Sequence, residues 1–155
     1  MRSLLELMDV HGGLHEKFAV HRDLVVGLEF AKALAALEDF ERTLRAHMDD
    51  EERHILPLYE RRVGPVAGGD PQFFWLEHKN LLRNLDTMKE ALRPLATDPK
   101  AGRRQAHEFL QKQSLFLQIL EHHELREKNI LYPQLDAAVS DVEREAILSQ
   151  CGGPA

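Results

Sequence analysis

The chain has 155 residues, of which 43% are hydrophobic and 30% charged, and its formal net charge is −6 at pH 7. This length and apolar content are sufficient for one buried core, so we expect a single globular domain and not a disordered chain. The acidic balance argues against a nucleic-acid or anionic-membrane partner, because the longest basic cluster is only Arg103-Arg104.

The opening segment MRSLLELMDV is interrupted by Glu6 and Asp9, and it lacks the apolar stretch of a signal peptide. No apolar run approaches the length of a membrane span, so we expect a cytoplasmic protein. The only cysteine, Cys151, cannot form an internal disulfide, and there is no Cys-x-x-Cys pair. A bound metal would therefore have nitrogen and oxygen ligands.

Apolar residues recur at helical spacing and predict helices at about residues 3–26, 28–62, 71–95 and 99–136, with a short fifth helix at 140–149. Gly27 separates the first two helices. Asp70 is expected to cap the third helix, with Pro71 at its first position, and Asp98-Pro99 repeats this pattern before the fourth.

Four helices joined by short turns pack most simply as an antiparallel, up-down-up-down bundle. We therefore predict an all-α fold in which residues 1–138 form the four-helix bundle and residues 139–155 form a C-terminal helix and tail. In such a bundle, cofactor sites lie between facing helices.

The second and fourth predicted helices share the pattern F-x3-L-x2-H-x3-E-x5-P. The copies are Phe40, Leu44, His47, Glu51 and Pro57, and Phe116, Leu120, His123, Glu127 and Pro133. In each copy the histidine and the glutamate are four residues apart, so they share the helix face of the core residues before them. Burying such a polar pair twice is costly, and a pair of metal ions between the copies is the simplest explanation.

Further ligands can be predicted from height, because residues at equal distances from a turn of an antiparallel hairpin lie at the same level. His78 and His123 lie almost symmetrically about the Asp98-Pro99 turn, so His78 is a predicted ligand. In the first hairpin His11 matches the level of His47 best. The mismatch for His21 is about 20 Å, which no side chain can span.

His15 follows His11 by four residues and shares its helix face, so it is predicted as an additional ligand or as a residue behind the ligands. The full predicted metal set is His11, His15, His47, Glu51, His78, His123 and Glu127. Glu51 and Glu127 are expected to bridge two metals, with His11 and His47 on one and His78 and His123 on the other. Imidazoles with bridging carboxylates favour a pair of iron ions, and manganese or zinc is left open.

Gly12 and Gly13 separate His11 from His15, and each costs on the order of 1 kcal/mol relative to alanine inside a helix. A close approach of the backbone to the site, a local bulge or a frayed helix start would each account for them. Among the remaining candidates, His54 is predicted to lie at the rim of the site. His107 and His122 are expected to be solvated. Packing as aromatic residues is the preferred role for Tyr59 and Tyr132, and the alternative is that they gate the site or hydrogen-bond to it.

The segments HMDDEERHILP, FWLEHKNLL and HELREKNILYP, together with a histidine on the first helix, resemble the hemerythrin-like (HHE) cation-binding domain over about residues 5–136. The resemblance implies a four-helix bundle with a non-haem, oxo- or hydroxo-bridged di-iron centre. It further implies binding of oxygen or nitric oxide, sensing of iron or oxygen, or protection and repair of iron centres.

The chain differs from the oxygen-carrying hemerythrins at two places. Those proteins have two histidines four residues apart on the third helix, where this chain has His78 and then Leu82, and they end with His-x4-Asp in place of His123 and Glu127. The chain is more similar to the four-His, two-Glu variant seen in proteins that repair iron centres. It lacks the Cys-bearing N-terminal extension common in that group.

We therefore predict a di-iron protein that binds oxygen or nitric oxide as a carrier, store or sensor, and a homodimer is compatible with this prediction. With four histidine ligands, each iron keeps an open coordination position, which suits sensing or redox turnover. With His15 as a fifth histidine ligand, one iron has no open position and the other keeps one, as in a carrier. The first alternative is a di-iron oxidoreductase, namely a peroxidase, a ferroxidase or an iron-centre repair protein. Ferritin-like enzymes use two Glu-x-x-His motifs, and only the one from Glu51 to His54 is present. The second alternative, a metal-free helical interaction module, leaves the duplicated His/Glu pairs unexplained.

Overall fold

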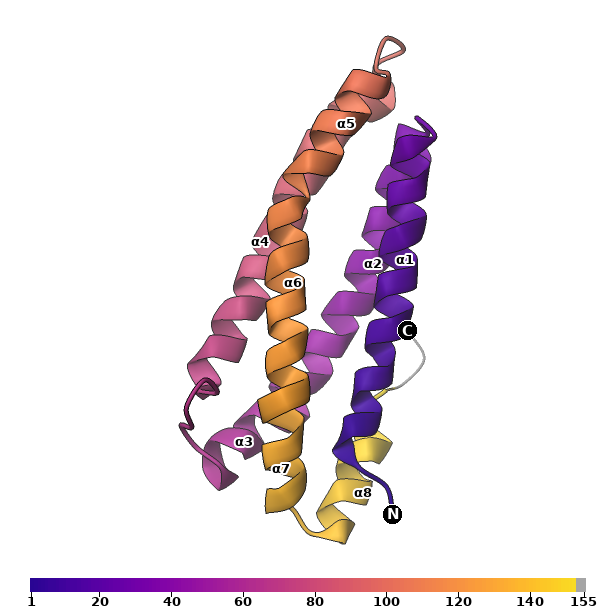
Figure 1. The fold of residues 1–155 in the computed structure, drawn as a ribbon. Helices are drawn as coiled ribbons and strands as arrows, with labels where there is room; N and C mark the ends of the chain where they lie inside the picture. Colours follow the sequence, from indigo (N-terminus) through magenta and orange to yellow (C-terminus); the bar gives the residue numbers. More distant parts are fainter. Residues whose placement is uncertain (153–155) are drawn as a thin grey trace.

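The computed structural model describes residues 1–152 as four antiparallel helical arms with a short helix across one end, which confirms the predicted all-α bundle (Figure 1). The elements in chain order are η1 (Leu4–Asp9), α1 (Val10–Val26), α2 (Phe30–Asp50), η2 (Glu51–Ile55), α3 (Leu56–Arg62), α4 (Pro71–Thr97), α5 (Arg103–Lys112), α6 (Ser114–Arg126), η3 (Glu127–Leu131), α7 (Tyr132–Ala138) and α8 (Asp141–Gln150). Residues 153–155, the end of the predicted tail, lie outside the described part. No helix among residues 1–152 is long and apolar enough to cross a membrane.

The start of the third arm follows the sequence prediction, and the start of the fourth does not. Asp70 caps α4 by accepting a hydrogen bond from the backbone N–H of Gln72 at 2.9 Å. Asp98 instead accepts from the N–H of Lys100 within a turn, and Gly102 precedes the first residue of α5. The Asp-Pro pair at residues 98–99 therefore forms the turn between two arms, and the helix begins four residues later than predicted.

The second and fourth arms each contain one turn of π-helix that begins at the duplicated glutamate. The N–H of Leu56 bonds to the carbonyl of Glu51, and the N–H of Tyr132 bonds to the carbonyl of Glu127. The next residue in each arm is proline, which has no N–H to donate to the carbonyl four residues earlier. We attribute the wider turns to these prolines, and they explain why proline belongs to the repeated motif.

Two apolar clusters fill the bundle. Phe18, Phe40 and Phe116 lie together in the larger cluster, with ring centroids 5.0 to 6.0 Å apart. The smaller cluster lies at the end covered by α8 and includes Tyr59 and Leu148. On every arm, a predicted metal ligand lies between the residues of the larger cluster and those of the smaller cluster. These ligands form a polar layer that divides the core.

Candidate metal centre

Six of the seven predicted metal ligands meet in this polar layer, and every arm contributes. The six are His11 from α1, His47 from α2, Glu51 from η2, His78 from α4, His123 from α6 and Glu127 from η3. All six are buried, with exposed fractions of 8% or less. Because each lies one helical turn or less from apolar core residues, the packing of the arms fixes their positions.

The six side chains form two groups, each able to hold one ion. His11, His47 and Glu127 form the first group, and Glu51, His78 and His123 form the second. Within each group the ligand atoms lie within 4.8 Å of one another. Each glutamate thus groups with histidines from other arms, and not with the histidine four residues before it.

Both carboxylates also contact imidazoles of the two groups at once. Glu51 Oε1 lies 3.0 Å from His47 Nε2, while Glu51 Oε2 lies 3.0 Å from His78 Nε2. Glu127 Oε1 lies 2.9 Å from His123 Nε2, and Glu127 Oε2 lies 3.5 Å from His47 Nε2. This is the arrangement expected of carboxylates that bridge two cations.

The pKa values of the buried groups in this layer depend on the charges of their neighbours. Burial disfavours the ionised carboxyl of Glu127, but attraction to His123 holds the pKa of Glu127 well below its usual range. Burial likewise opposes the charged imidazole of His123, but the Glu127 carboxylate outweighs it and raises the pKa of His123 to about 10. The pKa of His47 is also raised, because Glu51 outweighs the effect of burial. Two buried carboxylates therefore demand positive charge beside them, from protons or from metal ions.

Unsatisfied polar atoms indicate that this donor set fits cations. Both carboxylate oxygens of Glu127 and both ring nitrogens of His123 are buried and make no hydrogen bond, because the 2.9 Å contact between the two side chains is an ion pair without hydrogen-bond geometry. Buried polar atoms in native proteins are nearly always paired, so four orphaned atoms in one layer require an explanation. Four imidazoles and two carboxylates are ligands suited to iron, zinc or manganese.

The comparison with known families agrees with this geometry. Residues 3–135 match the family described as the hemerythrin HHE cation binding domain. The chain belongs to this HHE family. No curated protein and no solved structure matched the chain. The family description names cation binding, and the His/Glu layer contains groups able to hold cations, whereas α8 lies beyond the matched residues.

A carboxylate behind the layer orients one of its histidines, and a second carboxylate lies near another. His78 Nδ1 lies within hydrogen-bond distance of Glu52 Oε1, at 2.9 Å, whereas His123 Nδ1 lies 3.6 Å from Glu77 Oε1, an ion-pair distance without a hydrogen bond. Such contacts on the outer ring nitrogen turn Nε2 toward the metal side. The sequence analysis missed Glu52 and Glu77, although each is directly adjacent to a predicted ligand.

Tyr132 also belongs to the HHE centre. Its hydroxyl donates a hydrogen bond to Glu51 Oε1 at 2.7 Å. Burial, with Glu51 nearby, raises the pKa of Tyr132 well above its usual value, so the hydroxyl keeps its proton. Tyr132 is thus both packed and hydrogen-bonded to the site, which was the alternative left open by the sequence, whereas Tyr59 bonds to the carbonyl of Gly69 within the smaller cluster.

His15 lies beside the layer and not in it. Its side chain is 57% exposed, and its Nε2 lies 2.7 Å from Glu124 Oε2. His11 Nε2 lies 3.3 Å from His47 Nε2 in the layer, whereas His15, one turn further along α1, contacts Glu124 on α6 outside it. The ligand set that the structure brings together thus lacks the predicted His15. His107 and His122 are exposed, as expected of solvated residues.

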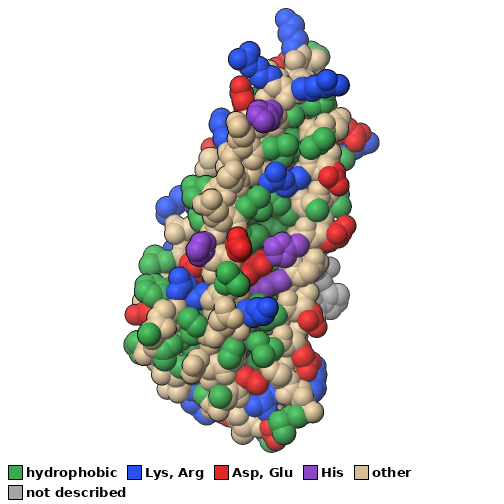
Figure 2. All heavy atoms as spheres, in the orientation of Figure 1, with side chains coloured by type: hydrophobic (Ala, Val, Ile, Leu, Met, Phe, Trp, Pro, Cys, Tyr) green, Lys and Arg blue, Asp and Glu red, His purple; other side chains and the backbone are tan. Residues whose placement is uncertain are grey.

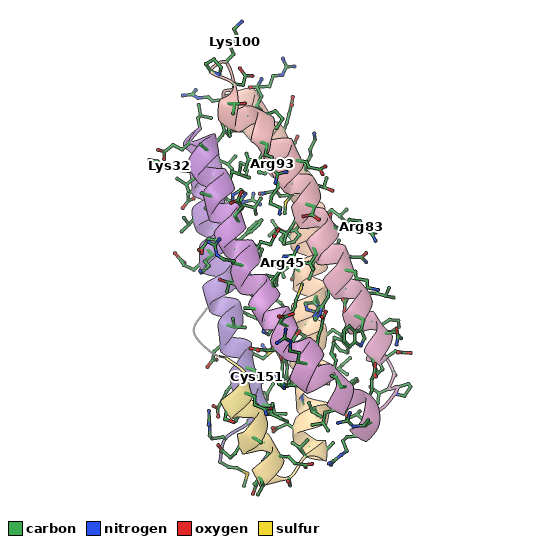
Figure 3. All side chains as sticks on the ribbon, turned by 180° about the vertical axis from the view of Figure 1, so that it is seen from behind. Lys32, Arg45, Arg83, Arg93, Lys100 and Cys151 are labelled. Carbon is green, nitrogen blue, oxygen red and sulfur yellow. The ribbon has the colours of Figure 1, made fainter. Side chains whose placement is uncertain are left out.

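Two cavities reach the centre. One, of about 390 Å³, reaches His47, Glu51 and Tyr132, and Cys151 at the end of α8 lines its wall (Figure 3). The other, of about 600 Å³, lies between α1 and α6 and reaches His11. A small molecule thus has two approaches to the layer, one lined by α8 and one on the open side of the bundle.

Proposed function

We propose that the chain is a non-haem di-iron protein that binds oxygen or nitric oxide. In this proposal His11 and His47 bind one iron, His78 and His123 bind the other, and Glu51 and Glu127 bridge. The observation that supports it most directly is that each carboxylate contacts imidazoles of both groups. Iron is favoured because bridging carboxylates and imidazoles suit a redox-active pair.

The ligand count favours a sensor over a carrier. Without His15, each iron receives two imidazoles and shares of two carboxylates, so both keep open positions for a small ligand. A carrier of the asymmetric kind would need a fifth histidine at the layer, and the nearest one, His15, is paired with Glu124.

The cavity beside α8 supports a small, uncharged ligand. Leu7, Val10 and Ile55 contribute apolar surface to it, charged side chains such as Lys17 and Asp50 also line it, and it reaches His47 and Glu51. Oxygen and nitric oxide are small and apolar enough to pass along the apolar part of this lining.

A second function, a di-iron oxidoreductase, is favoured by one observation. The oxidisable side chains of Tyr132 and Cys151 line the same cavity as His47 and Glu51. When bound, the metal pair would supply redox chemistry, and these side chains would be the nearest protein groups able to give an electron. Peroxide consumption by the iron-loaded protein, with Tyr132→Phe and Cys151→Ser as comparisons, tests this alternative.

The main test is iron content combined with optical spectra. We expect two irons per chain and charge-transfer bands that change on reduction and on addition of azide or nitric oxide. A colourless protein that takes up only traces of iron after reconstitution would contradict the proposal. Two tightly bound zinc or manganese ions, with iron excluded, would contradict the choice of metal.

Substitution of a bridging residue tests the ligand assignment. Glu127→Ala removes the carboxylate that contacts both groups, so we expect the iron content to fall from two per chain to one or fewer. Glu108→Ala, at an exposed position on α5, is the matched control and should retain both irons. If Glu127→Ala also retains both, the bridging assignment is wrong.

A further inference from the structure

The cleft between α1 and α6 connects the surface to the proposed metal centre. It has a volume of about 600 Å³, and His11 lies at its inner end. Figure 2 shows histidine and acidic side chains together on this face of the molecule. The arms that form the cleft pack mainly against other partners, α1 against α2 and α6 against α4, so the cleft lies on the least closed side of the bundle.

Three metal-ligating side chains line this cleft outside the buried layer. His15 Nε2 lies 2.7 Å from Glu124 Oε2, and Glu121, three residues before Glu124 on α6, lines the same cleft. The second oxygen of Glu124 is buried and has no hydrogen-bond partner. Lys128 is the one lysine or arginine of the lining, so two carboxylates leave the cleft with a net negative charge.

We propose that His15 and Glu124 form an uptake site that captures divalent iron from solvent and delivers it to His11, while Glu121 on the same cleft wall adds negative charge. One imidazole and one carboxylate are suitable ligands for a hydrated divalent ion. Fewer protein ligands than in the buried layer make this binding weak, which is required if the ion is to move inward. His15 and His11 lie one turn apart on α1, so an ion released by the first histidine reaches the second within about 6 Å. This inference rests on the proposed metal centre.

A structural role for the same pair predicts the opposite effect. If the bond between His15 and Glu124 only holds α1 against α6, its loss opens the cleft and speeds the access of metal to His11. If the two side chains capture the ion, their loss slows metal uptake without changing the final occupancy. The sign of the change in rate therefore distinguishes the two roles.

The experiment measures metal uptake by the apo full-length chain after rapid mixing with Co²⁺, followed by the visible absorption of the bound ion. We expect Glu124→Gln to slow uptake about tenfold, at the lower end of the effect of charge on association rates, because it removes a negative charge from the cleft. His15→Ala removes the imidazole ligand and should also slow uptake. Both should reach the wild-type metal content and spectrum. The matched controls are His122→Ala and Glu108→Gln, which alter exposed side chains outside the cleft and should leave the rate unchanged.

Unchanged or faster uptake in both His15→Ala and Glu124→Gln would overturn the inference while leaving the proposed function intact. Slower uptake in the control variants to the same extent would also overturn it, because the effect would then arise from overall charge. A wild-type chain that binds no metal at all would instead overturn the proposed function itself. If the uptake rate of the wild type falls with added salt and that of the two cleft variants does not, electrostatic capture is supported.

Discussion

The only polar side-chain atom of Tyr132, its hydroxyl oxygen, forms a hydrogen bond with a residue of the His/Glu layer. Its hydroxyl donates to Glu51 Oε1 at 2.7 Å, and the side chain is fully buried. Tyr132→Phe removes this donor and leaves one carboxylate oxygen less well held. We expect the affinity for the second metal ion to fall about ten- to hundredfold, as for other partners of metal ligands, and a competition titration with a chelator measures it.

Tyr59→Phe is the control for this substitution. The Tyr59 hydroxyl donates to the carbonyl of Gly69 and makes no contact with the layer, so its loss should lower stability by about 1 kcal/mol without changing metal affinity. Equal metal affinity in Tyr132→Phe and the wild type would show that the bond to Glu51 has no effect on the centre.

His21 links pH to stability at a site far from the metal layer. Its Nδ1–H donates to the carbonyl of Ala33, and its Nε2 accepts from Gln113, both at 2.7 Å. Burial lowers the pKa of His21 below 6.5, although the bond to Ala33 acts in the other direction. The unfolded chain therefore binds more protons in the range between the lowered pKa and about 6.5, so stability falls as the pH drops through this range.

His21→Gln removes this titration while keeping a polar side chain opposite Gln113. We expect the free energy of unfolding, measured by urea denaturation from about pH 5 to about pH 7.5, to fall less steeply at low pH than in the wild type. The titrating groups of the metal layer are the same in both proteins, so their contribution cancels when the unfolding free energies of the wild type and His21→Gln are subtracted at each pH. Parallel curves would contradict a neutral, buried His21.

Spacing along the helices was sufficient to predict which residues meet in the layer, with one exception. His47, Glu51, His123 and Glu127 follow from the repeat, and His78 from its height relative to His123. His15 shares a helix face with His11, but a shared face does not specify which neighbouring arm a side chain contacts, and His15 contacts Glu124 on α6 outside the layer. The carboxylates behind the histidines depend on contacts between arms, such as His123 with Glu77, and no single-helix pattern contains them.

At the scale of elements, the helical arms were predictable and the π turns were not. A 3.6-residue pattern continues through Glu51–Ile55 and Glu127–Leu131, since one wider turn adds only a single residue. The prolines six residues after each glutamate were visible in the sequence. Their consequence depends on hydrogen bonding that the side-chain pattern does not report.

The two glycines in α1 give a prediction about the stability of that helix. A Cβ added at Gly12 would meet nothing within 4 Å, so a close approach of the backbone does not explain this glycine. Gly12→Ala should therefore raise the free energy of unfolding by about 1 kcal/mol through helix propensity, measured by urea denaturation. Gly13 lines the cavity beside α8 and is left unchanged.

Gly69→Ala is the opposite case and serves as the comparison. A Cβ at this position would lie 2.8 Å from the Tyr59 hydroxyl and would collide with Ile130. We expect a loss of about 1–3 kcal/mol for this overpacking. If Gly12→Ala lowers stability instead, the first turns of α1 need glycine for a reason other than space.

At the scale of the whole molecule, the antiparallel arrangement followed from the breaks between arms, whereas the position of α8 did not. The periodicity of residues 140–149 predicted a helix, and the structure packs its Ile147 and Leu148 into the smaller apolar cluster. Exposed ion pairs between residues distant in sequence accompany this packing, including those of Arg2 with Glu145 and Arg62 with Glu143. Such pairs are not apparent in a single sequence, so docking of α8 could not be predicted.

Arg144 connects α8 to the rest of the bundle and thereby controls access to the thiol of Cys151. Its guanidinium donates to Asp136 Oδ1 and to the carbonyl of Asp136, both at 2.8 Å, while Asp136 also accepts from the N–H of Leu4. Burial, with Asp50 and Glu51 nearby, raises the pKa of Cys151 to about 12, so the docked thiol is almost entirely protonated and unreactive.

Arg144→Ala should release α8 and expose this thiol, because the partly exposed Asp136 carboxylate then loses its cationic partner on α8. We expect labelling of Cys151 by a thiol reagent at mildly alkaline pH to become more than about tenfold faster than in the wild type. Arg104→Ala breaks only an exposed pair with Glu108 and should leave the labelling rate unchanged. Equal rates in all three proteins would mean that the apolar contacts of Ile147 and Leu148 hold α8 in place without Arg144. Faster labelling of Arg144→Ala alone would show that an ion-pair anchor beyond the family-matched residues keeps the cavity wall of the metal centre closed.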